Sequence, residues 1–147
     1  MIERTRHLHR LSEAVRRSPV TALLGLLHSL LGATSREALL GHPKAGASWE
    51  GYVLEQVQQV LAPFEIYFWG TYSGAELDAF FLRKGKRYGL EVKFSEAPRI
   101  TKSMQIALDD LRLDQLWVIY PGSHRYPVDE RITVLPSEVF LKEQGAR

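Results

Sequence analysis

Three charged side chains in the middle of the chain are spaced so that one β-hairpin could bring them together. Asp78 precedes a basic, glycine-containing turn, and Glu91 and Lys93 follow it. If the hairpin is centred between Lys84 and Gly85, Asp78 lies directly opposite Glu91, with Cβ atoms roughly 4.5–5.5 Å apart. Lys93 is two residues further along and points to the same side of its strand.

Two carboxylates at this spacing can share a hard divalent cation, because Mg²⁺ and Mn²⁺ prefer oxygen ligands. A cation held there polarises a phosphodiester and acidifies its bound water. Lys93 could orient or deprotonate that water, or stabilise the charge that develops on the phosphate. The pattern is therefore compatible with a Mg²⁺ or Mn²⁺ site, with Asp78 and Glu91 as ligands.

The same alternation of charged and apolar residues also describes an ordinary half-exposed hairpin. In that interpretation the facing acids are solvated, and Lys93 forms a cross-strand ion pair with Glu76. A register shifted by one residue would separate the acids as well, because it turns every side chain to the other face. Spacing alone leaves both interpretations open.

A third acid lies on a predicted helix. Ser48 is a suitable N-cap, apolar residues recur at helical spacing as far as Leu61, and Pro63 ends the helix. Glu50 lies near the start of this helix, on the side that carries the apolar stripe. Packing of that stripe on a sheet would direct Glu50 toward the hairpin.

The remaining elements define the expected fold. Strands are predicted at residues 66–72, 76–83, 88–95, 116–120 and 131–135, with an amphipathic helix at residues 100–111 and a short helix at the end. Short turns make the first three strands an antiparallel meander, and the helical crossover allows the next strand a parallel neighbour. The expected fold is α/β, a mixed sheet with helices packed on it.

Composition bounds the class of protein. The 147 residues suit one domain, and the absence of cysteine excludes disulfides and thiolate zinc sites. The formal net charge is only +2, so a basic surface for nucleic acid would have to be local. The apolar run at residues 20–31 is shorter than the roughly 20 residues of a membrane span. We expect a cytoplasmic protein without a membrane segment.

The candidate residues together resemble a known superfamily. A glutamate early in a helix, Asp78 on the second strand and Glu91-X-Lys93 on the third are similar to the PD-(D/E)XK nucleases. More narrowly, the stretch from His42 to Val53 (His-Pro-Lys-Ala-Gly-Ala-Ser-Trp-Glu-Gly-Tyr-Val) resembles a domain of unknown function. That domain follows the AAA-type ATPase core in many prokaryotic ATPases. The motifs Tyr-Phe-Trp at 67–69, Gly-Ala-Glu-Leu-Asp at 74–78 and Leu-Glu-Val-Lys at 90–93 extend the resemblance.

The resemblance implies a restriction-endonuclease-like fold over residues 42–147, with residues 1–41 as an amino-terminal helical segment. It implies Glu50 as the helix acid and third metal ligand, Asp78 and Glu91 as metal ligands, and Lys93 as the catalytic lysine. Leu77 stands where the superfamily motif has proline. The chain contains no Walker-type phosphate loop, so an AAA-type ATPase would be a separate domain or subunit.

Further contacts with nucleic acid are predicted on the helix at residues 100–111 and just before it. Arg99 and Lys102 could contact phosphates, and Gln105 could approach the site; a solvated helix face is the alternative. The aromatic residues at 67–69 and Tyr72 could stack on bases. Packing in the core and across strands is the alternative for these.

Two classes of function remain open from the sequence. The first is a Mg²⁺- or Mn²⁺-dependent nuclease that hydrolyses DNA, or RNA, phosphodiesters through Glu50, Asp78, Glu91 and Lys93. The second is a non-catalytic module of nuclease fold that binds nucleic acid, an ATPase partner or a second copy of itself as a homo-oligomer.

Overall fold

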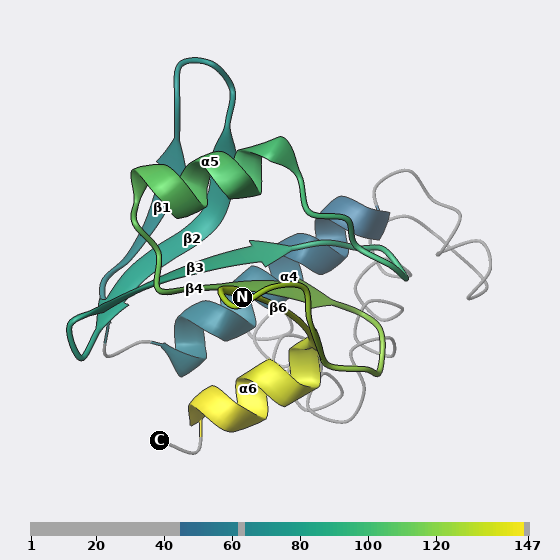
Figure 1. Ribbon diagram of the computed structural model, residues 1–147. Helices are drawn as coiled ribbons and strands as arrows, with labels where there is room; N and C mark the ends of the chain where they lie inside the picture. The colour runs from purple at the N-terminus through teal and green to yellow at the C-terminus, as the bar shows by residue number, and fades with distance from the viewer. Residues whose placement is uncertain (1–44, 62–63, 146–147) are drawn as a thin grey trace, which may run out of the picture. The chain divides into compact units, whose positions relative to one another are not determined.

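The computed structural model describes residues 45–61 and 64–145 (Figure 1). The helical segment predicted at residues 1–41 lies outside the described residues. The elements are α4 (Ala45–Val60), β1 (Ile66–Gly70), β2 (Glu76–Arg83), β3 (Lys86–Val92), α5 (Lys102–Asp110), β4 (Gln115–Tyr120), β5 (Tyr126–Pro127), β6 (Ile132–Pro136) and α6 (Ser137–Gly145). The chain divides into two units, Met1–Trp49 and Glu50–Arg147, and the sheet lies wholly in the second.

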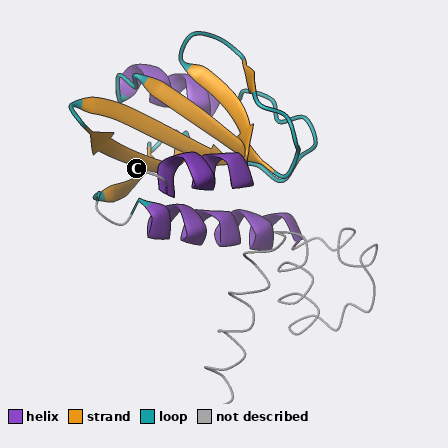
Figure 2. Ribbon diagram, turned by 90° about the horizontal axis from the view of Figure 1, so that it is seen from below, coloured by secondary structure: helices purple, strands orange, loops and turns teal. Residues whose placement is uncertain are grey.

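The sheet has six strands in the order β1-β2-β3-β4-β6-β5. β1, β2 and β3 form an antiparallel meander, β4 runs parallel to β3, and β6 runs parallel to β4. The crossover from β3 to β4 contains α5, which lies on one face of the sheet, while α4 and α6 lie on the other (Figures 1 and 2). These findings confirm a mixed α/β sheet with helices on it.

The hairpin between β2 and β3 has the predicted centre. Arg83 pairs with Lys86, and the two residues between them both have positive φ, 51° at Lys84 and 76° at Gly85. Two successive residues with positive φ are typical of a type I′ turn, whose twist matches that of the flanking strands. The glycine adopts its angle without a Cβ clash, and the lysine adopts a left-handed conformation that is uncommon for its type.

Both faces of the sheet are buried against helices. On the α5 face, Leu77 belongs to an apolar cluster with Met104 and Leu108 of α5. On the other face, the rings of Tyr88 and Trp117 stack with centroids 4.9 Å apart. A strand covered on both sides reads as nearly continuous apolar sequence, which makes a charged side chain within β3 conspicuous. None of the helices in residues 45–61 and 64–145 combines the length and apolar character of a membrane span.

Glycine is required at position 89 of β3, where the strand packs closely against Leu113 and Leu116. A Cβ built at this position would lie 2.5 Å from Leu113 Cδ1 and 3.1 Å from Leu116 Cδ1. We expect Gly89→Ala to lower the free energy of unfolding by about 1–3 kcal/mol, because the clash lies in a packed core. Gly51→Ala in α4, where a Cβ meets nothing within 4 Å, is the matched control and should raise it by about 0.5–1 kcal/mol. Urea unfolding measures both, and a neutral Gly89→Ala would contradict the packing.

Candidate active site at the end of strand β3

Asp78 and Glu91 face each other at the open end of the β2–β3 hairpin. The last backbone pair is Ala79 with Leu90, which leaves the two acids directly opposite at the next position. Beyond that pair the carboxylates continue the ladder: Val92 N–H donates to Asp78 Oδ2 at 2.7 Å, and Asp78 N–H donates to Glu91 Oε2 at 3.3 Å. The predicted register is therefore confirmed. Each of the two carboxylates accepts a backbone hydrogen bond from the strand that carries the other acid.

A β-bulge interrupts the pairing of β2 with β1 at Asp78. On either side of the irregularity, Tyr67 pairs with Phe80 and Trp69 pairs with Leu77. One residue of β1 therefore faces two residues of β2, and the first of these two is Asp78. Bulges bend a strand, increase its twist and redirect side chains, and they occur frequently beside active sites.

Lys93 pairs with Glu91 in the same strand. Its Nζ lies 2.6 Å from Glu91 Oε1, and no ion pair within the described residues joins Lys93 to Glu76. The Lys93 N–H donates to Ile119 O of β4 at 2.8 Å, so the backbone remains in the parallel ladder. The cross-strand pair that the ordinary-hairpin interpretation requires is therefore not formed, and the lysine lies beside the facing acids.

Glu50 reaches the same strand end from α4. Its Oε1 accepts a hydrogen bond of 3.1 Å from Phe94 N–H, just beyond β3. Its charge is near enough to raise the pKa of Lys93. The four predicted site residues thus meet around residues 91–94, although 44 positions separate the helix acid from its partner. The amides of Val92 and Phe94 complete the arrangement; being backbone groups, they leave no signal in the sequence.

The site holds charges where burial opposes them. Glu91 is only 6% exposed; burial raises its pKa, and the repulsion from Asp78 raises it further. Burial also raises the pKa of Asp78, against the hydrogen bond from Val92 N–H. For Lys93, burial acts to lower the pKa, but the bond to Glu91 and the charges of Asp78 and Glu50 together raise it. Lys93 is therefore held in its protonated form, beside two carboxyl groups whose pKa values are raised.

The donor atoms fit a hard cation in part. Asp78 and Glu91 supply carboxylate oxygens on facing strands, and a cation between them would relieve the repulsion that raises the pKa of Glu91. Across residues 45–61 and 64–145, however, no three His, Cys, Asp or Glu side chains are grouped so that they could hold a metal ion. Glu50 is turned to the Phe94 amide instead, and its role as a third ligand stays a prediction.

Arg99, Lys102 and Gln105 are exposed at and before the start of α5. Thr101 caps this helix, its side chain accepting from Met104 N–H at 3.3 Å. Among the described residues, no hydrogen bond or ion pair links the three exposed side chains to the four site residues. Their contact with nucleic acid stays a prediction.

Comparisons with known proteins place the chain in a family. The model for "Domain of unknown function (DUF4143)" matches residues 45–140. Uncharacterized protein Rv2008c of Mycobacterium tuberculosis and Uncharacterized protein Mb2031c of Mycobacterium bovis are each 46% identical over 128 residues. The match covers 86% of this chain and 29% of each relative, so the chain spans less than a third of their length. No solved structure matches significantly. The chain is a member of the DUF4143 family.

Proposed function

We propose that this domain is a Mg²⁺- or Mn²⁺-dependent nuclease of the PD-(D/E)XK type, acting on DNA phosphodiesters. The observation that carries the proposal is the meeting of Glu50, Asp78, Glu91 and Lys93 at one strand end. Like charges facing each other across strands destabilise a sheet, and burial adds to that cost at Glu91. Proteins tolerate such arrangements mainly where perturbed acids have a task.

The roles follow from the contacts. Asp78 and Glu91 would hold the cation, which supplies Lewis-acid polarisation of the phosphate and an acidified water. Lys93, whose pKa is raised, would remain a cation and stabilise the negative charge developing on the phosphate. Abstraction of a proton from water suits it less well, because a base must first be deprotonated. Glu50 would fix the strand end through the Phe94 amide.

The restriction-endonuclease-like fold belongs to the same proposal. A three-strand antiparallel meander, a helical crossover and a parallel fourth strand support it. Because the relatives are more than three times as long as their matched region, we also propose that the domain works beside an AAA-type ATPase domain or subunit in the cytoplasm.

A non-catalytic module is the second candidate. Two observations favour it: Lys93 is already paired with Glu91, and no three-acid metal group is assembled in the described part of the chain. Such a module would bind nucleic acid, an ATPase partner or a second copy of the chain.

Cleavage assays distinguish the two candidates. Linear, circular and single-stranded DNA, and RNA, are incubated with the protein and Mg²⁺, Mn²⁺ or EDTA, while calorimetry measures cation binding. The nuclease proposal expects cation binding and cleavage that EDTA abolishes. A folded protein that binds the cation but cleaves none of these substrates, alone or with its ATPase, would sink the proposal.

A further inference from the structure

The turn between β2 and β3 is a concentrated patch of positive charge. Four of its five residues, 83–87, are lysine or arginine; we call this segment the basic turn. Lys84, Lys86 and Arg87 are exposed. None of them belongs to any of the ion pairs found in the described residues. Exposed cations outside any ion pair repel one another and attract anionic partners.

The structure holds the basic turn in place. The Arg83 guanidinium lies 5.1 Å from the centroid of the Phe64 ring and donates to Gln144 Oε1 at 2.7 Å. Arg87 N–H donates to Asp114 Oδ2 at 2.7 Å, and the Arg87 guanidinium donates to Leu111 O at 3.1 Å. Asp114 offsets part of the charge. The lysines of the type I′ turn project from an anchored hairpin.

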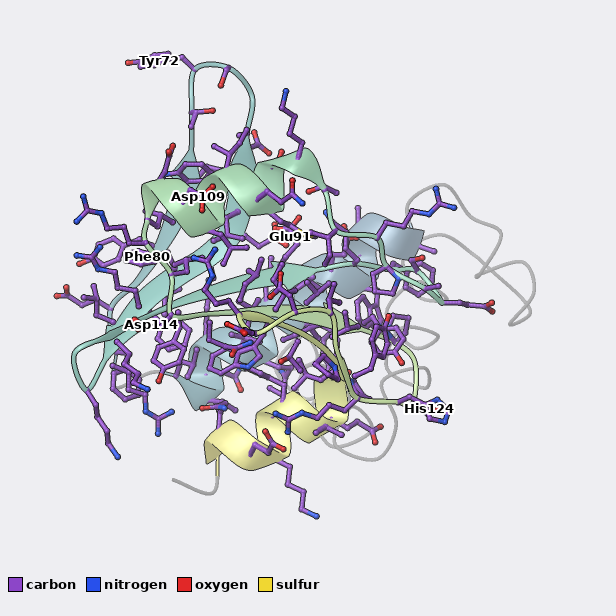
Figure 3. The ribbon with its side chains drawn as sticks, viewed as in Figure 1. Tyr72, Phe80, Glu91, Asp109, Asp114 and His124 are labelled. Atoms are coloured by element: carbon purple, nitrogen blue, oxygen red, sulfur yellow. The ribbon has the colours of Figure 1, made fainter. Side chains whose placement is uncertain are left out.

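The basic turn and the candidate site lie at opposite ends of the same two strands. Asp114, which marks the basic end, and Glu91, which marks the site, are well separated in Figure 3. From Asp78 to Arg83, β2 advances five residues, roughly 17 Å at about 3.3 Å per residue. At the duplex spacing of about 3.4 Å per nucleotide, roughly five nucleotides would cover that distance, and a more extended single strand would need fewer.

Exposed aromatic side chains lie along the edge between these ends. Tyr67 and Phe68 of edge strand β1, which we call the aromatic edge, are 48% and 66% exposed. As consecutive strand residues they point to opposite faces of the sheet, so the two rings flank the edge from its two sides. β1 runs antiparallel to β2, with Ile66 beside Phe81 near the basic turn and its other end beside Glu76 near the site. The Phe68 ring lies against Gly70, where a Cβ would be 3.1 Å from Phe68 Cε1.

We propose that the basic turn and the aromatic edge form a binding surface for single-stranded nucleic acid that leads toward the candidate site. The lysines contact phosphates, and the aromatic rings stack on unpaired bases, the combination that single-strand-binding proteins use. An acidic polypeptide would satisfy the cations but has no bases to stack on Tyr67 and Phe68. That the surface delivers a strand to the site for cleavage rests on the proposed function. That it binds a single strand does not.

Binding can be measured without cleavage. Fluorescence anisotropy in EDTA uses a labelled oligothymidylate of about 20 nucleotides, enough to cover a single-strand site, with the full chain at several salt concentrations. We expect Lys84→Asn/Lys86→Gln to weaken binding about tenfold and to lower the salt slope by about 1.4, since each phosphate contact contributes about 0.7. Asparagine suits the positive φ of Lys84. Phe68→Ser should weaken binding about tenfold through lost stacking.

The matched control is Lys142→Gln, an exposed lysine on α6, which should bind like the wild type. Equal binding by wild type and Lys84→Asn/Lys86→Gln, duplex binding as tight as single-strand binding, or displacement by polyglutamate as effective as by unlabelled oligothymidylate would each overturn the inference. A wild type that binds by this surface yet never cleaves overturns only the nuclease proposal. A wild type that cleaves, while the variants bind unchanged, overturns only the surface.

Discussion

Asp78→Asn is expected to reduce cation-dependent cleavage by about a thousandfold or more and, at the same time, to stabilise the cation-free protein at neutral pH. The loss of activity follows from removing one charged ligand, because a cation contributes several kcal/mol to such a reaction. The gain in stability follows from removing a charge that burial opposes and that repels Glu91. Asparagine retains an oxygen that can accept from Val92 N–H.

The pH dependence gives the sign of this effect. Because the pKa of Asp78 is raised in the folded protein, its contribution to stability is fully present below the unfolded pKa of about 3.9. That contribution is lost as the pH rises through the raised folded pKa. Asparagine does not titrate, so the variant should be more stable than the wild type at pH 7, by about 0.5–1 kcal/mol. The difference should vanish near pH 3.

Thermal unfolding of both proteins from pH 3 to pH 8, with and without Mg²⁺, tests this prediction. Saturating Mg²⁺ should stabilise the wild type, since a ligand that binds only the folded state raises stability, and should leave Asp78→Asn almost unchanged. Glu138→Gln, an exposed acid on α6, is the control for a general loss of negative charge. If Asp78→Asn were less stable at pH 7 and retained its cation response, the assignment would be wrong.

Lys93→Met is expected to destabilise the protein by about 1–3 kcal/mol at pH 7 and to reduce any cleavage about a hundredfold or more. Glu91 is 7% exposed at its side chain, and its charged form would lose the lysine that now lies 2.6 Å away. Removing one partner of a buried pair costs about 3–5 kcal/mol. The loss of about 1–3 kcal/mol expected here is smaller than that, because the Lys93 side chain is 36% exposed and solvent screens the pair.

A double substitution separates the lost ion pair from lost packing. In Lys93→Met, the pKa of Glu91 should rise further, so the deficit should shrink as the pH falls toward 4 and Glu91 takes up a proton. Lys93→Met/Glu91→Gln should recover most of the stability at pH 7 but none of the activity. Urea unfolding measures the stability, and a double variant no more stable than Lys93→Met would show that packing, not charge, accounts for the loss.

The sequence predicted the parts of the site that depend on local geometry. The turn at Lys84 and Gly85 fixed the hairpin centre, and period-two alternation then placed Asp78 opposite Glu91. Helical spacing directed Glu50 to the sheet end, where it bonds Phe94 N–H. Residues 1–41 and the His42 end of the family motif lie outside the described residues, so the predictions made for them are neither confirmed nor contradicted.

Other features depend on tertiary contacts that no local pattern records. The bulge at Asp78 arises from pairing with β1, and no glycine in β2 announces it. The burial of Glu91 arises because β3 is central in the sheet, while its alternation was equally typical of a half-exposed hairpin. The Lys93 partner depended on where the ladder ends: backbone pairing stops at Ala79 and Leu90, before Glu76 can face the lysine.

The separation of the site residues along the chain has a consequence for the order of folding. Asp78 and Glu91 are 13 residues apart and belong to one hairpin, whereas Glu50 meets its partner across 44 residues. Local contacts form early, because closing a short loop loses less entropy than closing a long one. We therefore expect the acid pair to come together before the helix acid arrives. We expect its repulsion to slow closure of the hairpin at neutral pH, so Asp78→Asn should accelerate folding as well as slow unfolding.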